Sequence, residues 1–309
     1  MSLIIKELLQ IGESALEKAG CMDPRIDVEL IMRFLLKLDK QQLFIKSPAL
    51  LDEKTCEAYF KLVDIRAGGM PVQYITGEQE FMGISFKVNE NVLIPRQDTE
   101  TLVEEVIREI KVMTTLKKVP RGGYQLLDLC CGSGAIGVSL CKLVKDVKVT
   151  AADISGKAVD VAKENAQNAG VIKLMRFEES DLFASLRKGI GGTKFHVITS
   201  NPPYIRREII PTLQREIVEH EPMIALDGGE DGLDFYRRIV VGAPDYLKPE
   251  GLLFMEIGHD QGGAVCALAS ETERFEDITI IRDLAGHDRV VKCRLKTPVK
   301  ASRRNRKSK

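Results

Sequence analysis

The sequence predicts an α/β protein in which a doubly wound, mostly parallel sheet follows a small N-terminal helical bundle. Three observations favour this fold. Apolar runs of strand length alternate with helical patterns over residues 91–298. A glycine-rich turn follows the first of these runs, at residues 130–137. Before residue 70, apolar side chains recur instead at helical spacings.

The first 70 residues are expected to form a bundle of helices. Ile4, Leu8 and Ile11 lie three or four residues apart and mark one face of the first helix. The second helix is expected to begin at Asp23, because an N-cap residue there is followed by proline. A further helix is expected to begin at Asp52 and to end at a pair of glycines.

A β-hairpin is expected to link this bundle to the rest of the chain. Residues 74–77 and 81–88 alternate polar and apolar side chains well enough for two strands. Either Asp98 or Thr99 is then expected to cap the next helix. The predicted organisation is a helical bundle (1–70), a hairpin linker (71–90), a catalytic domain (91–298) and a basic disordered tail (299–309).

Six strands of the sheet can be assigned from apolar runs. Because helical patterns separate most of these runs, parallel strands joined by crossover helices are expected, with the final pair antiparallel. The predicted strands are residues 125–130, 148–153, 195–200, 252–257, 278–281 and 290–295.

Charge and cysteine content argue against several classes of protein. The 309 residues carry 45 basic and 45 acidic side chains, and six of the basic ones lie in the last ten residues, which contain no acid. The body of the chain is therefore mildly acidic, which disfavours stable binding of nucleic acid. The seven cysteines lack paired metal-type spacing, so free thiols in a cytoplasmic protein are expected. No run of residues is apolar enough to span a membrane.

The glycine-rich turn predicts a site for an adenosine-type cofactor. Gly132, Gly134 and Gly137 match the spacing of the dinucleotide-binding loop. Asp153 ends the next predicted strand, where a carboxylate can accept hydrogen bonds from ribose hydroxyls. The glycines could instead serve only close packing of helix against strand.

Two further features favour S-adenosylmethionine over NAD. Asp128 precedes the loop and could orient it and meet a cationic amino-acid group. Asp181, with Leu182 and Phe183 beside it, follows the presumed third strand, where a carboxylate and apolar side chains would suit an adenine ring. Asp181 could equally be a helix N-cap with packed neighbours.

A four-residue segment, Asn201-Pro202-Pro203-Tyr204, follows the predicted strand at 195–200. Its chemistry suits a planar –NH2 group. The Asn201 side-chain carbonyl can accept one N–H, and a backbone carbonyl fixed by the two prolines can accept the other. Tyr204 offers a flat face for stacking. The alternative is a proline turn in which Tyr204 is merely packed.

At this point the sequence resembles a known family. Residues 128–137 resemble the S-adenosylmethionine loop of class I methyltransferases, and residues 201–204 resemble the tetrapeptide of those that methylate planar –NH2 groups. The surrounding frame is similar to the peptide chain release factor glutamine N5-methyltransferases. The segments that carry this likeness are 71–77, 81–86, 93–96, 221–233, 256–258 and 283–290. Gln97 and Cys130 depart from it, since the family usually has proline and often has glycine there.

The resemblance implies a seven-stranded sheet and methylation of the glutamine in the Gly-Gly-Gln loop of class I release factors, the expected protein partner. The catalytic residues it implies are Asn201, Pro202, Pro203 and Tyr204. The cofactor-binding residues expected are Asp128, Cys130, Cys131, Gly132, Ser133, Gly134, Asp153, Asp181, Leu182 and Asn201.

Three other functions are compatible with parts of the sequence. An adenine-N6 methyltransferase acting on DNA or RNA would present the same two N–H groups, but the acidic body disfavours it. An NAD-dependent oxidoreductase would leave residues 201–204 without a role. A non-catalytic binding module would not need Asp128, Asp153 and Asn201 together.

Overall fold

The computed structural model describes residues 2–116, 119–186, 192 and 194–297. The basic tail predicted at 299–309 lies outside these residues. The chain divides into two compact units. We call them the helical unit (Met1–Pro95 with Glu208–Leu226) and the sheet unit (Arg96–Arg207 with Asp227–Lys309).

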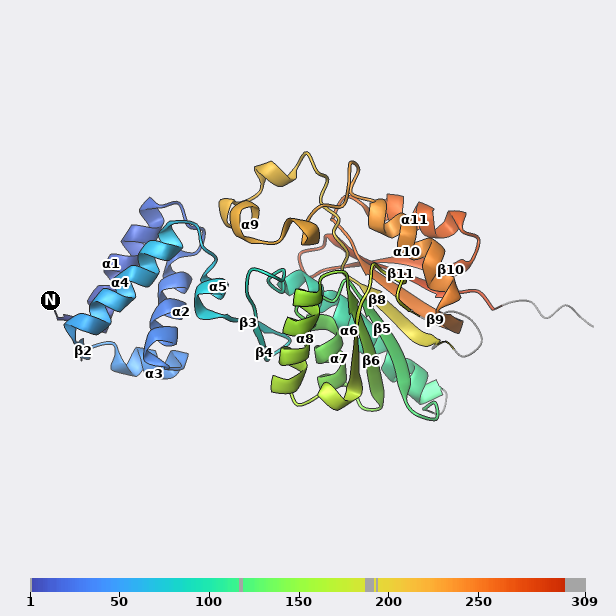
Figure 1. Ribbon diagram of the computed structural model, residues 1–309, viewed down its shortest axis with the longest axis horizontal. Coiled ribbons are helices and arrows are strands. Elements are labelled where there is room, and N and C mark those ends of the chain that lie inside the picture. Colours follow the sequence, from blue (N-terminus) through green and yellow to red (C-terminus); the bar gives the residue numbers. More distant parts are fainter. Residues whose placement is uncertain (1, 117–118, 187–191, 193, 298–309) are drawn as a thin grey trace, which may run out of the picture. The chain divides into compact units, whose positions relative to one another are not determined.

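Residues 5–72 of the helical unit form a bundle of helices whose apolar faces meet in one core (Figure 1). Its first helix ends just before Gly20, as predicted, and α4 begins with the Asp52 carboxylate accepting the Thr55 N–H at 2.8 Å. The second helix begins at Pro24, although the Asp23 side chain makes no capping bond. The helices are α1 (Ile5–Lys18), α2 (Pro24–Leu36), α3 (Lys40–Lys46), α4 (Glu53–Ala67), α5 (Val72–Thr76) and α9 (Arg215–His220). A short antiparallel pair joins β1 (Leu3–Ile4) to β2 (Leu50–Leu51).

The strand predicted at residues 74–77 is wrong. These residues belong to α5, in which the Tyr74 and Ile75 N–H groups both donate to the Pro71 carbonyl. Gly77, with φ of 74°, ends the turn in the left-handed conformation that glycine adopts without strain. A pattern of four residues fits a single helical turn as well as a strand. The hairpin lies wholly beyond it, in β3 (Glu78–Phe81) and β4 (Ile84–Lys87).

The sheet unit contains a seven-stranded sheet in the order β10-β11-β9-β8-β5-β6-β7, which confirms the predicted fold class. All neighbouring pairs from β9 to β7 are parallel, and β11 is antiparallel to both its neighbours, as expected for the final pair. The strands are β5 (Tyr124–Leu129), β6 (Val147–Asp153), β7 (Met175–Glu179), β8 (Phe195–Ser200), β9 (Leu247–Glu256), β10 (Phe275–Arg282) and β11 (Asp288–Leu295).

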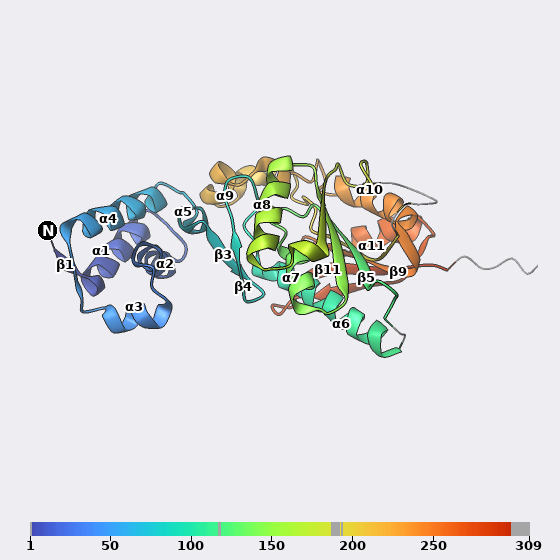
Figure 2. The ribbon, with the colours of Figure 1, turned by 60° about the horizontal axis from the view of Figure 1, so that its bottom comes forward.

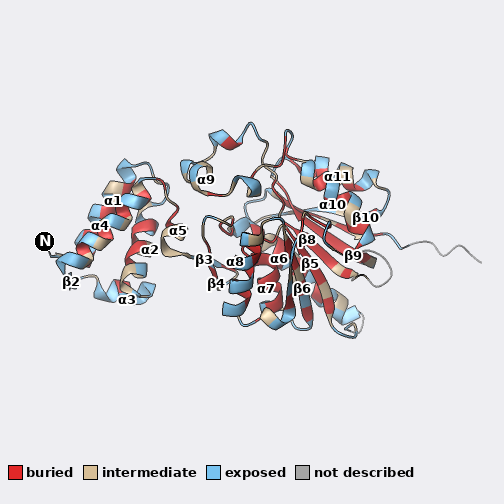
Figure 3. Cartoon of the chain, viewed as in Figure 1, coloured by how far each residue is buried: buried red, intermediate tan, exposed pale blue. Residues whose placement is uncertain are grey.

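Helices cover both faces of this sheet. One face is covered by α6 (Glu100–Leu116), α7 (Ala135–Leu143) and α8 (Gly156–Asn168). The opposite face is covered by α10 (Asp234–Gly242) and α11 (Gly262–Glu271) (Figure 2). Leu127, Ile198 and Leu253, on the central strands, are fully buried (Figure 3). Burial on two faces explains why these strands appear in the sequence as continuous apolar runs.

Candidate active site

The candidate site lies at the carboxyl ends of β5 and β8. These strands are parallel neighbours in the centre of the sheet, with Leu129 beside Ser200 at their ends. From β5 the chain builds outward through β6 and β7, then returns to place β8 on the other side of β5. This reversal is the topological switch point, where open α/β sheets bind their ligands. Strand order thus brings the glycine-rich loop and residues 201–204 to one edge.

The glycine-rich loop uses three left-handed residues to turn from β5 into α7. Cys130, Gly132 and Gly134 have φ values of 55°, 52° and 80°. A Cβ at Gly134 would lie 3.0 Å from the Ala162 Cβ, so glycine permits α7 and α8 to approach. A Cβ at Gly132 would meet nothing within 4 Å. Gly132 therefore faces open space that a ligand can enter.

Two carboxylates that were predicted to belong to the site, those of Asp128 and Asp153, accept hydrogen bonds from the backbone of the loop and of the helix that follows it. Asp128 is buried, accepts the Gly137 N–H at 3.1 Å and accepts the Thr199 hydroxyl at 2.9 Å. Burial raises the pKa of Asp128 to about 7, although these two bonds oppose the shift. Asp153 accepts the N–H groups of Gly132 and Ser155, each at 2.9 Å. Both residues therefore shape the loop, as predicted for Asp128.

A third anchor of the loop had no signal in the sequence. Asn165, buried on α8, donates to the Ser133 carbonyl at 2.9 Å. The neighbouring Cys131 is buried, and its N–H donates to the Ala152 carbonyl at 3.1 Å. Ser133 and Cys131 are thus held by their backbone groups. The contacts could not be predicted from the sequence, because they do not depend on the side chains of these two residues.

The predicted adenine-binding residues lie just beyond β7. The Asp181 carboxylate is paired with Arg238 at 2.7 Å and is partly exposed. Leu182 is buried with a left-handed φ of 50°. Phe183 stacks on Tyr246, with ring centroids 4.7 Å apart, and belongs to the core of the sheet unit. Phe183 thus packs in the core of the sheet unit, next to Leu182 in the chain.

Residues 201–204 contain two acceptors at the end of β8, Asn201 Oδ1 and the Pro202 carbonyl. The Asn201 Nδ2 donates to the Thr99 hydroxyl at 3.3 Å, which leaves Oδ1 on the other side of the amide. Among the described residues, no donor reaches either Asn201 Oδ1 or the Pro202 carbonyl. Pro202 and Pro203 are buried, and Tyr204 is partly buried. Within the described residues, the segment thus combines two buried prolines with two acceptors that no donor reaches.

A glycine-rich segment supports Tyr204 from behind. The Gln261 Nε2 donates to the carbonyls of Tyr204, at 2.9 Å, and Gly232, at 3.2 Å. A Cβ at Gly228 would lie 2.7 Å from the Tyr204 Cα, and one at Gly232 would lie 2.5 Å from the Tyr204 carbonyl oxygen. Backbone thus packs directly on backbone. Only glycine allows this approach.

Gly228→Ala is expected to displace Tyr204 and to lower activity together with stability. The added methyl would meet main-chain atoms that cannot turn away, and such overpacking typically costs about 1–3 kcal/mol. Unfolding free energy and methyl-transfer rate are the measurements. Gly263→Ala is the matched control, since a Cβ there meets nothing within 4 Å, and it should leave both unchanged. Wild-type values for Gly228→Ala would contradict this packing role.

A cluster of buried polar residues beside Asn201 was also not predicted from the sequence. Thr99, Glu256 and Arg289 are all buried in the sheet unit. Thr99 lies in a 3-10 turn (Gln97–Thr99) that precedes α6, so it is not the helix cap that was expected. Asp98 is likewise not a cap, and it pairs with Arg289 at 2.9 Å. Only the fold reveals these partners, which are far apart in sequence.

Comparison with known proteins identifies the family. Residues 7–77 match the model of the PrmC N-terminal domain, and residues 111–280 match the methyltransferase small domain. The release factor glutamine methyltransferase of Clostridium acetobutylicum is 41% identical over 288 residues, spanning 93% of this chain and 97% of the relative. The chain belongs to the release factor glutamine methyltransferase family.

Two further likenesses agree with this family. The enzyme of the same name from Clostridium botulinum is 37% identical over 94% of this chain and 99% of its own length. The crystal structure of the hMettl16 catalytic domain, in complex with a 3′UTR hairpin, has a TM-score of 0.54 at 12% identity and covers 76% of this chain and 80% of that one. That second likeness concerns the methyltransferase fold alone.

The two departures from the family pattern fall at sites that tolerate them differently. Gln97 is exposed in the 3-10 turn, where side chains of different shape can be accommodated. Cys130 occupies a left-handed position, which explains why glycine is frequent there in the release factor glutamine methyltransferases.

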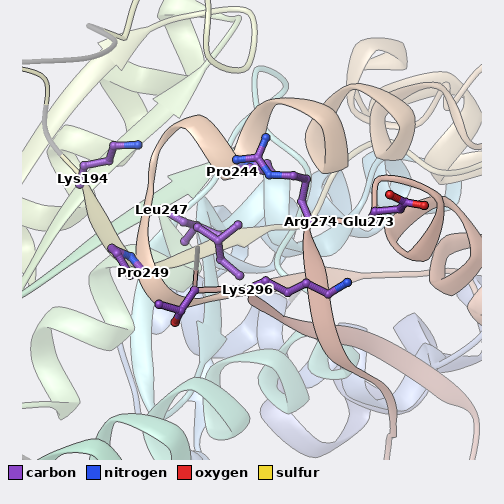
Figure 4. Close-up of a pocket in the computed structure, with 9 residues that line it drawn as sticks. Lys194, Pro244, Leu247, Pro249, Glu273, Arg274 and Lys296 are labelled. Carbon is purple, nitrogen blue, oxygen red and sulfur yellow. The ribbon is translucent and has the colours of Figure 1, made fainter. Parts of the chain in front are cut away.

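The other charged and hollow features lie away from this site. In the helical unit Glu216 pairs with Arg66 and Glu219 with Arg215, whereas Asp227 of the sheet unit pairs with Arg207. A hollow of about 460 Å³ opens at the amino ends of β8 and β9, the sheet edge opposite the candidate site (Figure 4). Within the described ranges there is no cluster of three or more metal-binding side chains. None of the helices described is both long and apolar enough to cross a membrane.

Proposed function

We propose that this protein transfers a methyl group from S-adenosylmethionine to the side-chain amide nitrogen of the glutamine in the Gly-Gly-Gln loop of class I peptide chain release factors. One observation carries the proposal: Asn201 Oδ1 and the Pro202 carbonyl are acceptors on consecutive residues, and no donor from the described residues reaches either. A primary amide carries two N–H groups on one nitrogen and would satisfy both. The relatives from Clostridium acetobutylicum and Clostridium botulinum are named release factor glutamine methyltransferases, which supports the proposal.

The difficulty of the reaction is the nucleophile. An amide nitrogen shares its lone pair with the carbonyl and is therefore a weak nucleophile. Two acceptors that each hold one N–H fix the nitrogen and favour its pyramidal form, with the lone pair directed at the methyl group. Positioning of this kind contributes at most about 7–11 kcal/mol, so a strong general base is not required. Tyr204 would hold the planar amide by stacking.

The glycine-rich loop fits the cofactor. S-adenosylmethionine supplies an electrophilic methyl group on a sulfonium. The open space at Gly132 allows its approach to the loop backbone, since a side chain there would occupy it. Asp153 accepts one N–H on each carboxylate oxygen and keeps a second lone pair on each, which suits ribose hydroxyls. Asp128 and Asp181 remain our candidates for the methionine and adenine ends.

Asp153→Ala is expected to weaken S-adenosylmethionine binding by about tenfold to a hundredfold, because it removes a carboxylate that serves both loop and ribose. The measurement is the cofactor Kd by isothermal titration calorimetry. Asp160→Ala, an exposed carboxylate on α8, is the control and should bind normally. An unchanged Kd for Asp153→Ala would exclude the ribose role.

Mass spectrometry of a class I release factor tests the whole proposal. After incubation with this protein and S-adenosylmethionine, we expect one added methyl group on the glutamine of the Gly-Gly-Gln loop. A release factor with that glutamine replaced by alanine should gain none. No modification, with cofactor binding confirmed, would overturn the proposed substrate. Methylation of adenine in added DNA or RNA would then support the alternative.

We propose the cytoplasm as the place of this reaction, because the cysteines of the protein are unpaired, as is usual in a reducing compartment.

A further inference from the structure

The direction of the Asn201 side chain is set by a residue 102 positions away. An amide offers donors on one side and an acceptor on the other. Because Asn201 Nδ2 donates to Thr99 Oγ1 at 3.3 Å, its Oδ1 points the opposite way. The reverse orientation would aim N–H groups at the N–H groups of the substrate. The contact with Thr99 therefore separates a productive Asn201 from an unproductive one.

Thr99 can serve as an acceptor only if its own proton is directed elsewhere. Interaction with the buried Thr99 hydroxyl, as a hydrogen bond, lowers the pKa of the Glu256 carboxyl, which places the two groups beside each other. A hydroxyl has a single hydrogen, and an ionised carboxylate can only accept. Thr99 must then donate to Glu256 and turn a lone pair toward Asn201. The three groups form a chain in which each donates to the next.

Glu256 is an unusual residue to find at the end of a central strand. It is the last residue of β9, is 1% exposed, and its Oε2 has no hydrogen-bond partner in the described part of the chain. Buried polar atoms left unpaired are rare and costly. Burial raises the pKa of Glu256 to about 7, while bonds with the Thr99 and Tyr204 hydroxyls oppose the shift.

Charged and polar groups around Glu256 come from three elements of the sheet unit. Arg289 on β11 lowers the pKa of Glu256, and Asp98 in the 3-10 turn raises it. These two are paired with each other at 2.9 Å, and Arg289 also binds Asp283 at 3.1 Å. From α10, the Tyr236 hydroxyl donates to the Glu256 backbone carbonyl at 2.8 Å. Among the described residues, no Lys or Arg forms an ion pair with the Glu256 carboxyl, which therefore keeps a titration of its own.

We propose that Thr99 and Glu256 are positioning residues that fix the amide of Asn201 in its productive orientation, and that they do so only while Glu256 is ionised. This rests on the proposed function. A protonated Glu256 becomes a donor to Thr99. The Thr99 hydrogen is then free to turn toward Asn201, whose amide rotates and presents its N–H groups to the substrate. The rate of methyl transfer falls, although substrate and cofactor still bind.

The test is the pH dependence of kcat between pH 5.5 and 8.5, with KM and cofactor Kd at each pH. We expect kcat of the wild type to fall up to tenfold per pH unit below about pH 7. In Glu256→Gln this inflection should disappear, because the group no longer titrates. Asp128 also has a pKa raised to about 7, so an inflection retained in Glu256→Gln would assign it to Asp128 and overturn the proposal.

Thr99 provides a second arm. Thr99→Val keeps the shape of the side chain but removes the hydroxyl. We expect kcat to fall about tenfold to a hundredfold, while KM and the cofactor Kd stay within about twofold of the wild-type values. Thr99→Ser restores the hydroxyl and should restore both kcat and its pH profile. Thr114→Val, which removes another hydrogen-bonded hydroxyl from α6, controls for general effects.

Three results would count against the positioning role. The first is a normal kcat in Thr99→Val. The second is a loss in Thr99→Val that Thr99→Ser does not recover. The third is a loss of kcat that merely follows a fall in the melting temperature across the variants. Absence of release-factor methylation by the wild type at every pH, with cofactor binding intact, would instead refute the proposed function.

Discussion

Asn201→Ala is expected to lower kcat by roughly 10²–10³, the size found when one preorganised polar contact is removed from an active site. The variant deletes the acceptor for one substrate N–H and leaves the Pro202 carbonyl to hold the amide alone. A singly held nitrogen can rotate about the remaining hydrogen bond. Its lone pair would then seldom point at the methyl group. The effect should appear in kcat more than in KM, because positioning matters most in the transition state.

Single-turnover methylation of a release factor measures this effect directly. Asn168→Ala, on the exposed end of α8, is the matched control and should react at the wild-type rate. The cofactor Kd should be measured alongside, because Asn201 was also predicted to contact the cofactor. Near-normal turnover by a folded Asn201→Ala would exclude its orienting role. A defect confined to the cofactor Kd would reassign it to cofactor binding.

Arg66→Met is expected to destabilise the helical unit by about 3–5 kcal/mol, the cost of breaking a buried ion pair by removing one partner. Arg66 is 5% exposed and pairs with Asp27 and with Glu216, each at 2.7 Å. Methionine matches the length of the side chain but leaves Asp27 charged and buried. Glu216 is more exposed and can turn to water, so the penalty falls mainly on Asp27.

Hydrogen exchange of peptides from α2 and α4 measures this unit separately from the rest of the chain. Arg25→Met is the control: the Arg25–Glu29 pair is 3.6 Å long and largely exposed, so its loss should cost less than about 1 kcal/mol. Combining Arg66→Met with Asp27→Asn should recover much of the stability, since no buried charge remains. Equal protection in Arg66→Met and Arg25→Met would refute the role of burial.

Local sequence patterns were sufficient to predict where the central strands lie and which two loops follow them at the candidate site. A strand such as β8 is buried on both faces, so its apolar run is continuous and its end is marked by a change of chemistry at Asn201. The glycines of the cofactor loop were also recognisable, because backbone geometry alone requires them. The error at residues 74–77 arose where a pattern was too short to separate one helical turn from a strand.

The residues that tune the site could not be found in this way. Thr99 and Asn201 meet because the fold brings the 3-10 turn (Gln97–Thr99) to the end of β8, and Glu256 joins them from the end of β9. Nothing in the neighbouring sequence distinguishes Thr99 from a helix cap or Glu256 from a surface acid. Their significance depends on burial and on distant partners, both of which are set by strand order.

The helical unit is not a contiguous piece of the chain, and this affects how the gene could be rearranged. Residues 208–226 cluster with residues 1–95, although sheet-unit residues flank them on both sides. Arg66 in the first segment pairs with Glu216 in the second. A recombination event that exchanged only the first 95 codons would therefore separate residue 66 from the sequence with which it evolved. The two segments must therefore be inherited as a matched set. Chimaeras of related enzymes should fold best when both segments come from one parent.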